Sequence, residues 1–207
     1  MTYGLAIHAV SPELGLAIGN GEGDLRSATW LLGRSLSTHL HSYLVEFLPP
    51  QTWSDLGFIA VAKGPGSFTS TRLGMVTART LGAQLDIPVF AISTLAAIAH
   101  FEAAENVENS RDIAVQMSAA QGKLFTAIYR ISPSDGGAIV VQTDAVQTPE
   151  SWQQTLDSRE NTYHLIRAES DLGKYVISVF ELAYLDWKQG KKPHWSEAKP
   201  FYGQQPV

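Results

Sequence analysis

Three short runs with strand-like patterns open the chain. Residues 3–10 carry apolar side chains on both alternating faces, which is typical of a strand covered on both sides. Residues 14–18 alternate leucine and isoleucine with small residues, and a third run follows at 24–31. The pair Asn20-Gly21 between the last two runs favours a tight hairpin. The segment therefore predicts a three-stranded meander.

In the following residues, segments with apolar side chains at helical spacing alternate with short apolar strands. The remaining elements of this half are, in chain order, a helix at 35–48, a strand at 57–62, a helix at 67–85, a strand at 88–92 and a helix at 93–102. Pro49-Pro50 ends the first helix, and either Ser67 or Thr69 can cap the second. The first half thus has the predicted order βββαβα, followed by one further strand and helix.

Polar residues from 102 to 112 predict a linker. After it, the βββαβα order of strands and helices is repeated. The second set comprises strands at 113–117, 124–131, 138–147 and 162–167, a helix that begins at Thr148-Pro149 as N-cap and first residue, and a last helix capped by Ser170. Two successive βββαβα halves indicate an α/β protein with the duplicated ribonuclease-H-like, or actin-like, fold. We expect one lobe at 1–103 and a more divergent one at 104–207.

Composition narrows the function classes. The 207 residues include no cysteine, which excludes a disulfide scaffold and a cysteine nucleophile. A net charge of −5 makes the chain a poor lone binder of nucleic acid. The longest apolar run, 89–101, is too short and too interrupted for the ~20 residues of a membrane span. Residues 1–5 have no basic region, so we expect no secretory signal there. We expect a soluble cytoplasmic protein.

The most informative local motif is a glycine-rich turn between a strand and a helix. It consists of Lys63-Gly64-Pro65-Gly66-Ser67-Phe68-Thr69, followed by Arg72-Leu73-Gly74. Backbone N–H groups at such a turn can hold a phosphate. No Gly-Lys-Ser/Thr closes it as in a P-loop, and Ser67 lacks the frame of a nucleophile elbow. The residues alone therefore favour a structural turn over a phosphate site.

The helix after this turn carries small residues at every fourth position, namely Gly74, Ala78 and Gly82. Such a row lies on one face of a helix and allows another backbone to approach closely. The approaching element is either this protein's own sheet or the helix of a partner, and the row by itself leaves both open.

Residues that could bind a metal ion or take part in catalysis do not form a recognisable motif in the sequence. None of the six histidines has His-x-x-x-His spacing, and His39 and His41 point to different faces of their helix. We predict no metal, no cofactor and no catalytic residue. The basic residues of 188–199 can touch RNA phosphates in a larger assembly, although a solvated helix end is the more ordinary interpretation.

The glycine–serine block, with Arg72-Leu73-Gly74 and Asp86-Ile87-Pro88-Val89 after it, resembles the bacterial TsaB (YeaZ) family. The likeness covers about residues 2–99 and weakens afterwards, although Ala198–Tyr202 is similar to the family's C-terminal motif. The resemblance implies the actin-like fold and a role in forming threonylcarbamoyladenosine beside the anticodon of tRNA. It implies a noncatalytic platform for a TsaD-like transferase, with a TsaE-like ATPase joining the complex and tRNA bound only indirectly.

The resemblance also implies which residues meet the partner. Members of the family pair with TsaD, or with a second copy, through two helices that correspond to 35–48 and 68–85 here. The interface candidates on these helices are Leu36, Leu40, Tyr43, Gly74, Ala78 and Gly82. The residues of the family motif are Gly64, Pro65, Gly66, Ser67, Phe68, Thr69 and Arg72.

Two positions depart from the family pattern. His8 and Ser118 stand where many members have aspartate, at strand ends that hold Mg²⁺ in actin-like ATPases. An autonomous ATPase or a glycoprotease-like hydrolase is the alternative function, and the missing acids weigh against it. A self-sufficient homodimer with another role is a third possibility.

Overall fold

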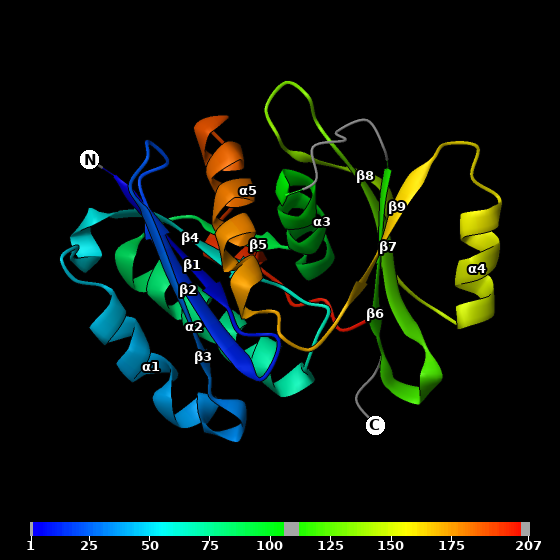
Figure 1. Cartoon of the computed structure of the whole chain (residues 1–207). Helices are drawn as coiled ribbons and strands as arrows, with labels where there is room; N and C mark the ends of the chain where they lie inside the picture. The colour runs from blue at the N-terminus through cyan, green and yellow to red at the C-terminus, as the bar shows by residue number, and fades with distance from the viewer. Residues whose placement is uncertain (1, 106–111, 204–207) are drawn as a thin grey trace.

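Two mixed sheets stand side by side in the computed structural model, which describes residues 2–105 and 112–203 (Figure 1). The first sheet has the order β3-β2-β1-β4-β5. Its strands are β1 (Tyr3–His8), β2 (Glu13–Gly19), β3 (Leu25–Leu31), β4 (Leu56–Ala62) and β5 (Val89–Ile92). The first three form the predicted antiparallel meander, and β4 and β5 continue parallel to β1.

The second sheet repeats this plan with one strand fewer, in the order β8-β7-β6-β9. Its strands are β6 (Asp112–Ser118), β7 (Leu124–Ile131), β8 (Ala138–Gln147) and β9 (Tyr163–Ala168). The first three are antiparallel neighbours, and β9 pairs in parallel with β6. The predicted duplicated actin-like fold is thereby confirmed.

Helices separate and flank the sheets (Figure 1). They are α1 (Leu36–Phe47), α2 (Phe68–Leu85), α3 (Thr94–Glu105), α4 (Pro149–Asp157) and α5 (Val176–Lys188). Helices α1 and α2 cover the outer face of the first sheet, and α4 covers that of the second. Between the sheets, α3 packs on β6 and β7 of the second sheet, whereas α5 packs on β1 and β4 of the first. The division at 103/104 stays a prediction.

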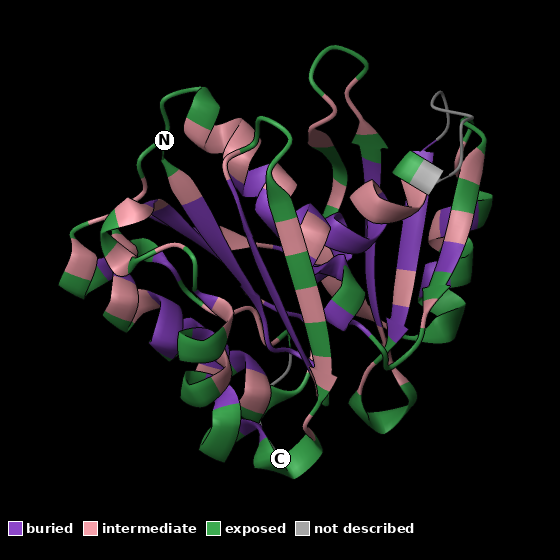
Figure 2. Ribbon diagram, turned by 60° about the vertical axis from the view of Figure 1, so that its left-hand side comes forward, coloured by how far each residue is buried: buried purple, intermediate pink, exposed green. Residues whose placement is uncertain are grey.

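Strand alternation distributes the core between the two faces of the first sheet. Leu5 and Ile7 of β1 join the cluster under α1 and α2, and Ala6 joins the cluster around α3 and α5. The edge strand β3 instead alternates exposed and half-buried residues (Figure 2). Within the described part of the chain, no helix is both long and apolar enough to cross a membrane.

Two predicted boundaries differ from the structure. Helix α3 continues to Glu105, so the predicted linker begins later, and residues 106–111 lie outside the described residues. The prediction that Ser170 caps the last helix is wrong, because α5 begins at Val176 after a 3₁₀ turn. The backbone N–H of Gly173 in that turn donates to the Glu13 carboxylate, 2.9 Å away, a long-range contact that delays the helix.

Candidate functional site

The glycine-rich turn follows the carboxyl end of β4 and leads into α2. It lies at the end of the sheet that faces the second lobe. Ser67, rather than Thr69, is the N-cap of α2, and its Oγ accepts a hydrogen bond from the Ser70 N–H. Gly64 has a φ of +97°, and a Cβ there would lie 2.4 Å from the Phe201 carbonyl oxygen. Glycine is required here for both its conformation and its size.

Two backbone groups of the turn, one on Gly64 and one on Ser67, are bonded to other parts of the chain. The Ser67 N–H donates to the Val10 carbonyl at 2.8 Å, and the Gly64 carbonyl accepts from the Thr94 N–H at 2.9 Å. Pro65 has no N–H to offer. A Cβ on Gly66 would lie 2.3 Å from the Val10 oxygen, so the turn is packed tightly against the end of β1. This geometry supports the structural interpretation of the motif over a phosphate cradle.

A cavity of about 560 Å³ lies between the lobes beside this turn. Ser11 and Ser67 line it from the first lobe, and Ser118 and Glu169 line it from the second. Among the described residues that line it there is no lysine or arginine, and Glu169 carries its only charge. A nucleotide phosphate would meet no cation here. The cavity is therefore chemically suited to an uncharged ligand.

His8 ends β1 where an actin-like ATPase needs an acid, and it is fully buried. Neither ring nitrogen has a hydrogen-bond partner within the described chain. Burial lowers the pKa of His8 to about 3, so the imidazole is neutral near pH 7. The described residues contain no group of three or more His, Asp or Glu side chains placed to hold a metal. The predicted absence of a metal and a cofactor stays a prediction.

The C-terminal segment 198–203 crosses the cleft between the lobes. The Phe201 N–H donates to the Lys63 carbonyl at 2.7 Å, and the rings of Tyr202 and Phe68 lie 4.4 Å apart. A Cβ on Gly203 would lie 2.7 Å from Val146 of the second lobe. Tyr202 lines the cavity just described, and Phe201 lines a neighbouring one of about 530 Å³. The segment thus separates two cavities and covers the glycine-rich turn.

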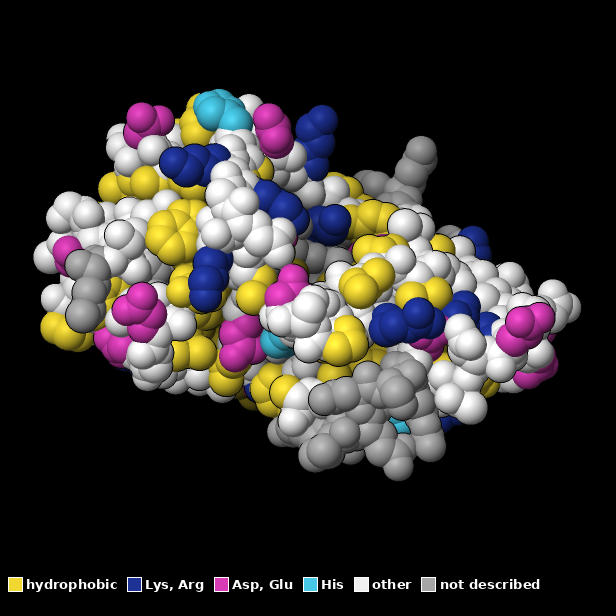
Figure 3. Space-filling model, turned by 90° about the horizontal axis from the view of Figure 1, so that it is seen from above, with side chains coloured by type: hydrophobic (Ala, Val, Ile, Leu, Met, Phe, Trp, Pro, Cys, Tyr) yellow, Lys and Arg dark blue, Asp and Glu magenta, His cyan; other side chains and the backbone are white. Residues whose placement is uncertain are grey.

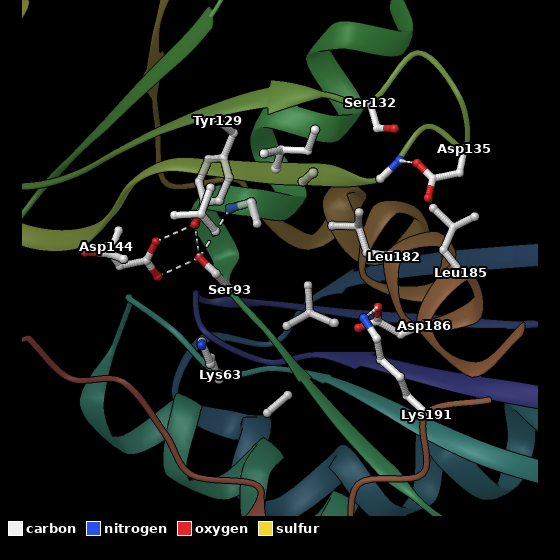
Figure 4. Close-up of a pocket in the computed structure, with 18 of the residues that line it drawn as sticks. Lys63, Ser93, Tyr129, Ser132, Asp135, Asp144, Leu182, Leu185, Asp186 and Lys191 are labelled. Atoms are coloured by element: carbon white, nitrogen blue, oxygen red, sulfur yellow. Dashed lines mark hydrogen bonds and ion pairs between the residues drawn. The ribbon is translucent and has the colours of Figure 1, made fainter. Parts of the chain in front are cut away.

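The neighbouring cavity contains a hydrogen-bonded group that sequence reasoning missed (Figure 4). Ser93 Oγ and the Tyr129 hydroxyl each donate to the Asp144 carboxylate at 2.6 Å. Ser93 Oγ also accepts from the backbone N–H groups of the first turn of α3, as the side chain of an N-cap does. Burial and Asp144 raise the pKa of Tyr129, which keeps the phenol protonated. The group fixes α3 to the second sheet.

The row of small residues on α2 faces this chain's own sheet and loops. Ala78 is fully buried, and a Cβ on Gly74 would lie 3.0 Å from that of Ala9. A Cβ on Gly82 would lie 2.3 Å from Val89 and 3.1 Å from Trp195. The row therefore serves packing within the chain, which corrects the expectation that it offers a surface to a partner.

The candidates on α1 have a similar position. Leu36 and Leu40 are buried in the core beneath the helix, and Tyr43 is half-buried with its ring 4.7 Å from that of Trp30. Apart from Phe68 at the start of α2, the large apolar side chains that α1 and α2 expose are Val45, 61% exposed, and Val76, 52% exposed. Periodic apolar residues identify the face of a helix that packs on the core. A single exposed valine interrupts no pattern, so the sequence does not single out Val45 or Val76.

Two lobes that share the order βββαβα, the first of them extended by β5 and α3, place the chain in the actin-like class. A family model described as "TsaD: tRNA N6-adenosine threonylcarbamoyltransferase" matches residues 50–168. The solved structure titled "YeaZ from Pseudomonas aeruginosa" superposes with a TM-score of 0.79 at 21% identity, covering 98% of this chain and 100% of that one.

Two curated proteins named "tRNA threonylcarbamoyladenosine biosynthesis protein TsaB" are similar in sequence. The Bacillus subtilis protein is 31% identical over 143 residues, which is 67% of this chain and 57% of that protein. The Escherichia coli protein is 26% identical over 125 residues, 58% of this chain and 53% of that protein. The chain belongs to the TsaB (YeaZ) family, and its matched region spans little more than half of these relatives.

Proposed function

We propose that this protein is a noncatalytic platform subunit in the formation of threonylcarbamoyladenosine in tRNA. In this role it supports a TsaD-like transferase that modifies the adenosine next to the anticodon. The names of its relatives supply the pathway, and one observation of the structure supports the noncatalytic role. At the end of β1 the fold presents a buried, neutral His8, where Mg²⁺ chemistry needs a carboxylate.

The composition of the cleft agrees with this role. The cavity beside the glycine-rich turn lacks a lysine or arginine among its described lining residues, and the turn's Ser67 N–H is bonded to Val10. The C-terminal segment lies over the same turn. Hydrolysis or transfer of a phosphate at this site would have to proceed without a lysine or arginine among the described residues that line it.

The partner surface in this proposal is the exposed side of α1 and α2. Val45 and Val76 are the large apolar side chains that these helices expose beyond Phe68 at the cleft. Apolar positions of this kind lose their contact with water when a second helix pair packs on them. A TsaD-like subunit occupies this surface in the assembled complex, which a TsaE-like ATPase then joins. A second copy of the chain can occupy it in the absence of that subunit.

Co-purification with a tagged TsaD-like subunit tests the proposal. Val76→Arg should weaken complex formation at least tenfold, because it places a charge in the centre of the contact. Val140→Arg is the matched control, since Val140 is 53% exposed but lies on β8 of the second lobe. Circular dichroism should show both variants folded. Failure of the unmodified protein to bind the transferase, or equal loss with both variants, would contradict the proposal.

A further inference from the structure

Strand β5 leaves part of its outer edge open. In a parallel pair, alternate residues bond to the neighbouring strand, and Pro88 and Ile92 give their carbonyls to β4. Val89 and Ala91 therefore direct their backbone groups away from β4. Beyond β5 the sheet has no further strand, and the Ala91 N–H has no partner within the described residues. Ala91 and Ile92 are half-exposed, whereas the first half of the strand is buried.

The chain itself already uses one rung of this edge. The Val89 N–H donates to the Pro193 carbonyl at 3.3 Å, so the segment after α5 begins to add to the sheet. Pro193 has no N–H to return, and the following residues turn away into a short 3₁₀ turn at Trp195–Glu197. The edge of β5 can thus pair with an extended backbone, but the segment after α5 forms only one hydrogen bond with it before turning away.

A groove of about 640 Å³ follows the vacated edge. Its lysines are Lys63, Lys191, Lys192 and Lys199, and its carboxylates are Asp186 and Glu197. Lys191 is paired with Asp186 at 2.5 Å, as Figure 4 shows. The other three lysines have no ion pair within the described chain and face a single remaining carboxylate. The groove therefore has a surplus of positive charge beside open backbone groups.

We propose that this groove, called here the β5 groove, binds an extended acidic peptide segment of a partner protein by strand addition. The backbone of the segment pairs with Ala91, and its carboxylates lie near Lys63, Lys192 and Lys199. A nucleic acid would use the lysines but not the backbone groups of the edge. The groove mixes its lysines with Asp186 and Glu197 and so lacks the continuous basic field that a phosphate backbone covers. Basic and acidic side chains are also mixed on the molecular face seen in Figure 3. The β5 groove is separate from Val45 and Val76, so this inference goes beyond the proposed function.

Binding of short synthetic peptides to the full chain tests the inference. The probe is a capped ten-residue peptide of alternating threonine and glutamate, with the threonine–lysine peptide of equal length as the charge control. Calorimetry should give at least tenfold tighter binding for the acidic peptide. By nuclear magnetic resonance, hydrogen exchange at the Ala91 amide should slow at least tenfold when that peptide is bound.

Charge reversal separates the groove from general electrostatics. The double variant Lys192→Glu/Lys199→Glu should weaken acidic-peptide binding at least tenfold. The matched double variant Arg34→Glu/Lys188→Glu, which changes exposed cations outside the groove, should change it less than threefold. Equal binding of the two peptides, equal weakening by the two double variants or an unprotected Ala91 amide would overturn the inference. Tighter binding of a ten-nucleotide oligouridylate that displaces the acidic peptide would also overturn it.

Discussion

The Cα of Gly74 lies so close to Ala9 that a Cβ on the glycine would come within 3.0 Å of the Ala9 Cβ. This contact seats α2 on the loop that leaves β1, and Ala78, one turn further along the helix, is fully buried. The small residues of α2 thereby determine how the glycine-rich turn is held against the first sheet.

Ala78→Arg should unfold the protein or prevent its expression. The new guanidinium would be buried without a partner, which costs roughly 3–5 kcal/mol in addition to the overpacking. Val76→Arg on the exposed side of the same helix should change stability by about 0.5 kcal/mol or less. Urea denaturation followed by circular dichroism measures both. A folded Ala78→Arg protein of unchanged stability would contradict the packing described for α2.

His8 should make the protein less stable as the pH falls. Its pKa is about 3 in the folded state and about 6.5 when unfolded, so the unfolded chain binds the proton more readily. The contribution of neutral His8 to the free energy of unfolding is complete above pH 6.5. As the pH falls from 6.5 to 3, this contribution decreases by about 1.4 kcal/mol per pH unit. His8→Leu should flatten this dependence in urea titrations at several pH values.

Exposed His39 provides the control for that series, because His39→Leu removes a histidine that is already in water. The partly buried His100, whose pKa is also lowered by desolvation, contributes in the same direction and is common to all three proteins. An identical pH dependence in the His8→Leu variant and the unmodified protein would show that His8 is not buried as described.

Asp112→Ala should be among the most destabilising substitutions in the second lobe. The side chain is fully buried at the start of β6 and is paired with both Arg130 and Arg159. Its removal leaves two cations without their counter-charge, and we expect a loss of roughly 3–5 kcal/mol. Asp157→Ala, at the exposed end of α4, is the control. Thermal unfolding should separate the two variants, and equal midpoints would contradict the role of the ion pairs.

Mg·ATP should not bind to the protein at micromolar concentrations. The cavity beside the glycine-rich turn has one described charged residue, Glu169, which repels phosphate, and the β1 end carries neutral His8. Isothermal titration calorimetry of the isolated chain measures this directly. A micromolar dissociation constant that Mg²⁺ removal weakens would favour the alternative of an actin-like ATPase.

Local signals predicted most elements of the fold, because they depend on residues that are near each other in sequence. Thr148-Pro149 caps α4 as predicted, since both the cap and the missing N–H act within one turn. Ser170 failed as a cap because Glu13, far away in the sequence, holds the turn before α5. The packing of α3 against α5 between the sheets likewise depends on contacts that are distant in sequence.

The candidate site was less accessible to sequence reasoning. The small residues of α2 fit a partner helix and an internal contact equally well, and only the positions of Ala9 and Trp195 decide between them. Ser93 precedes α3, whereas Tyr129 lies on β7 and Asp144 on β8, so no local motif connects the three residues. The resemblance of the glycine-rich turn identified the family, while its tight packing explains the glycines.

The most direct test is the level of threonylcarbamoyladenosine in tRNA from cells depleted of this protein, measured by nucleoside mass spectrometry. Depletion should lower the modified nucleoside at least tenfold, and the unmodified gene and Val140→Arg should restore it. Val76→Arg, which remains folded but loses the proposed contact, should not. Normal levels after depletion, or full restoration by a Val76→Arg protein that does not bind the transferase, would contradict the platform role.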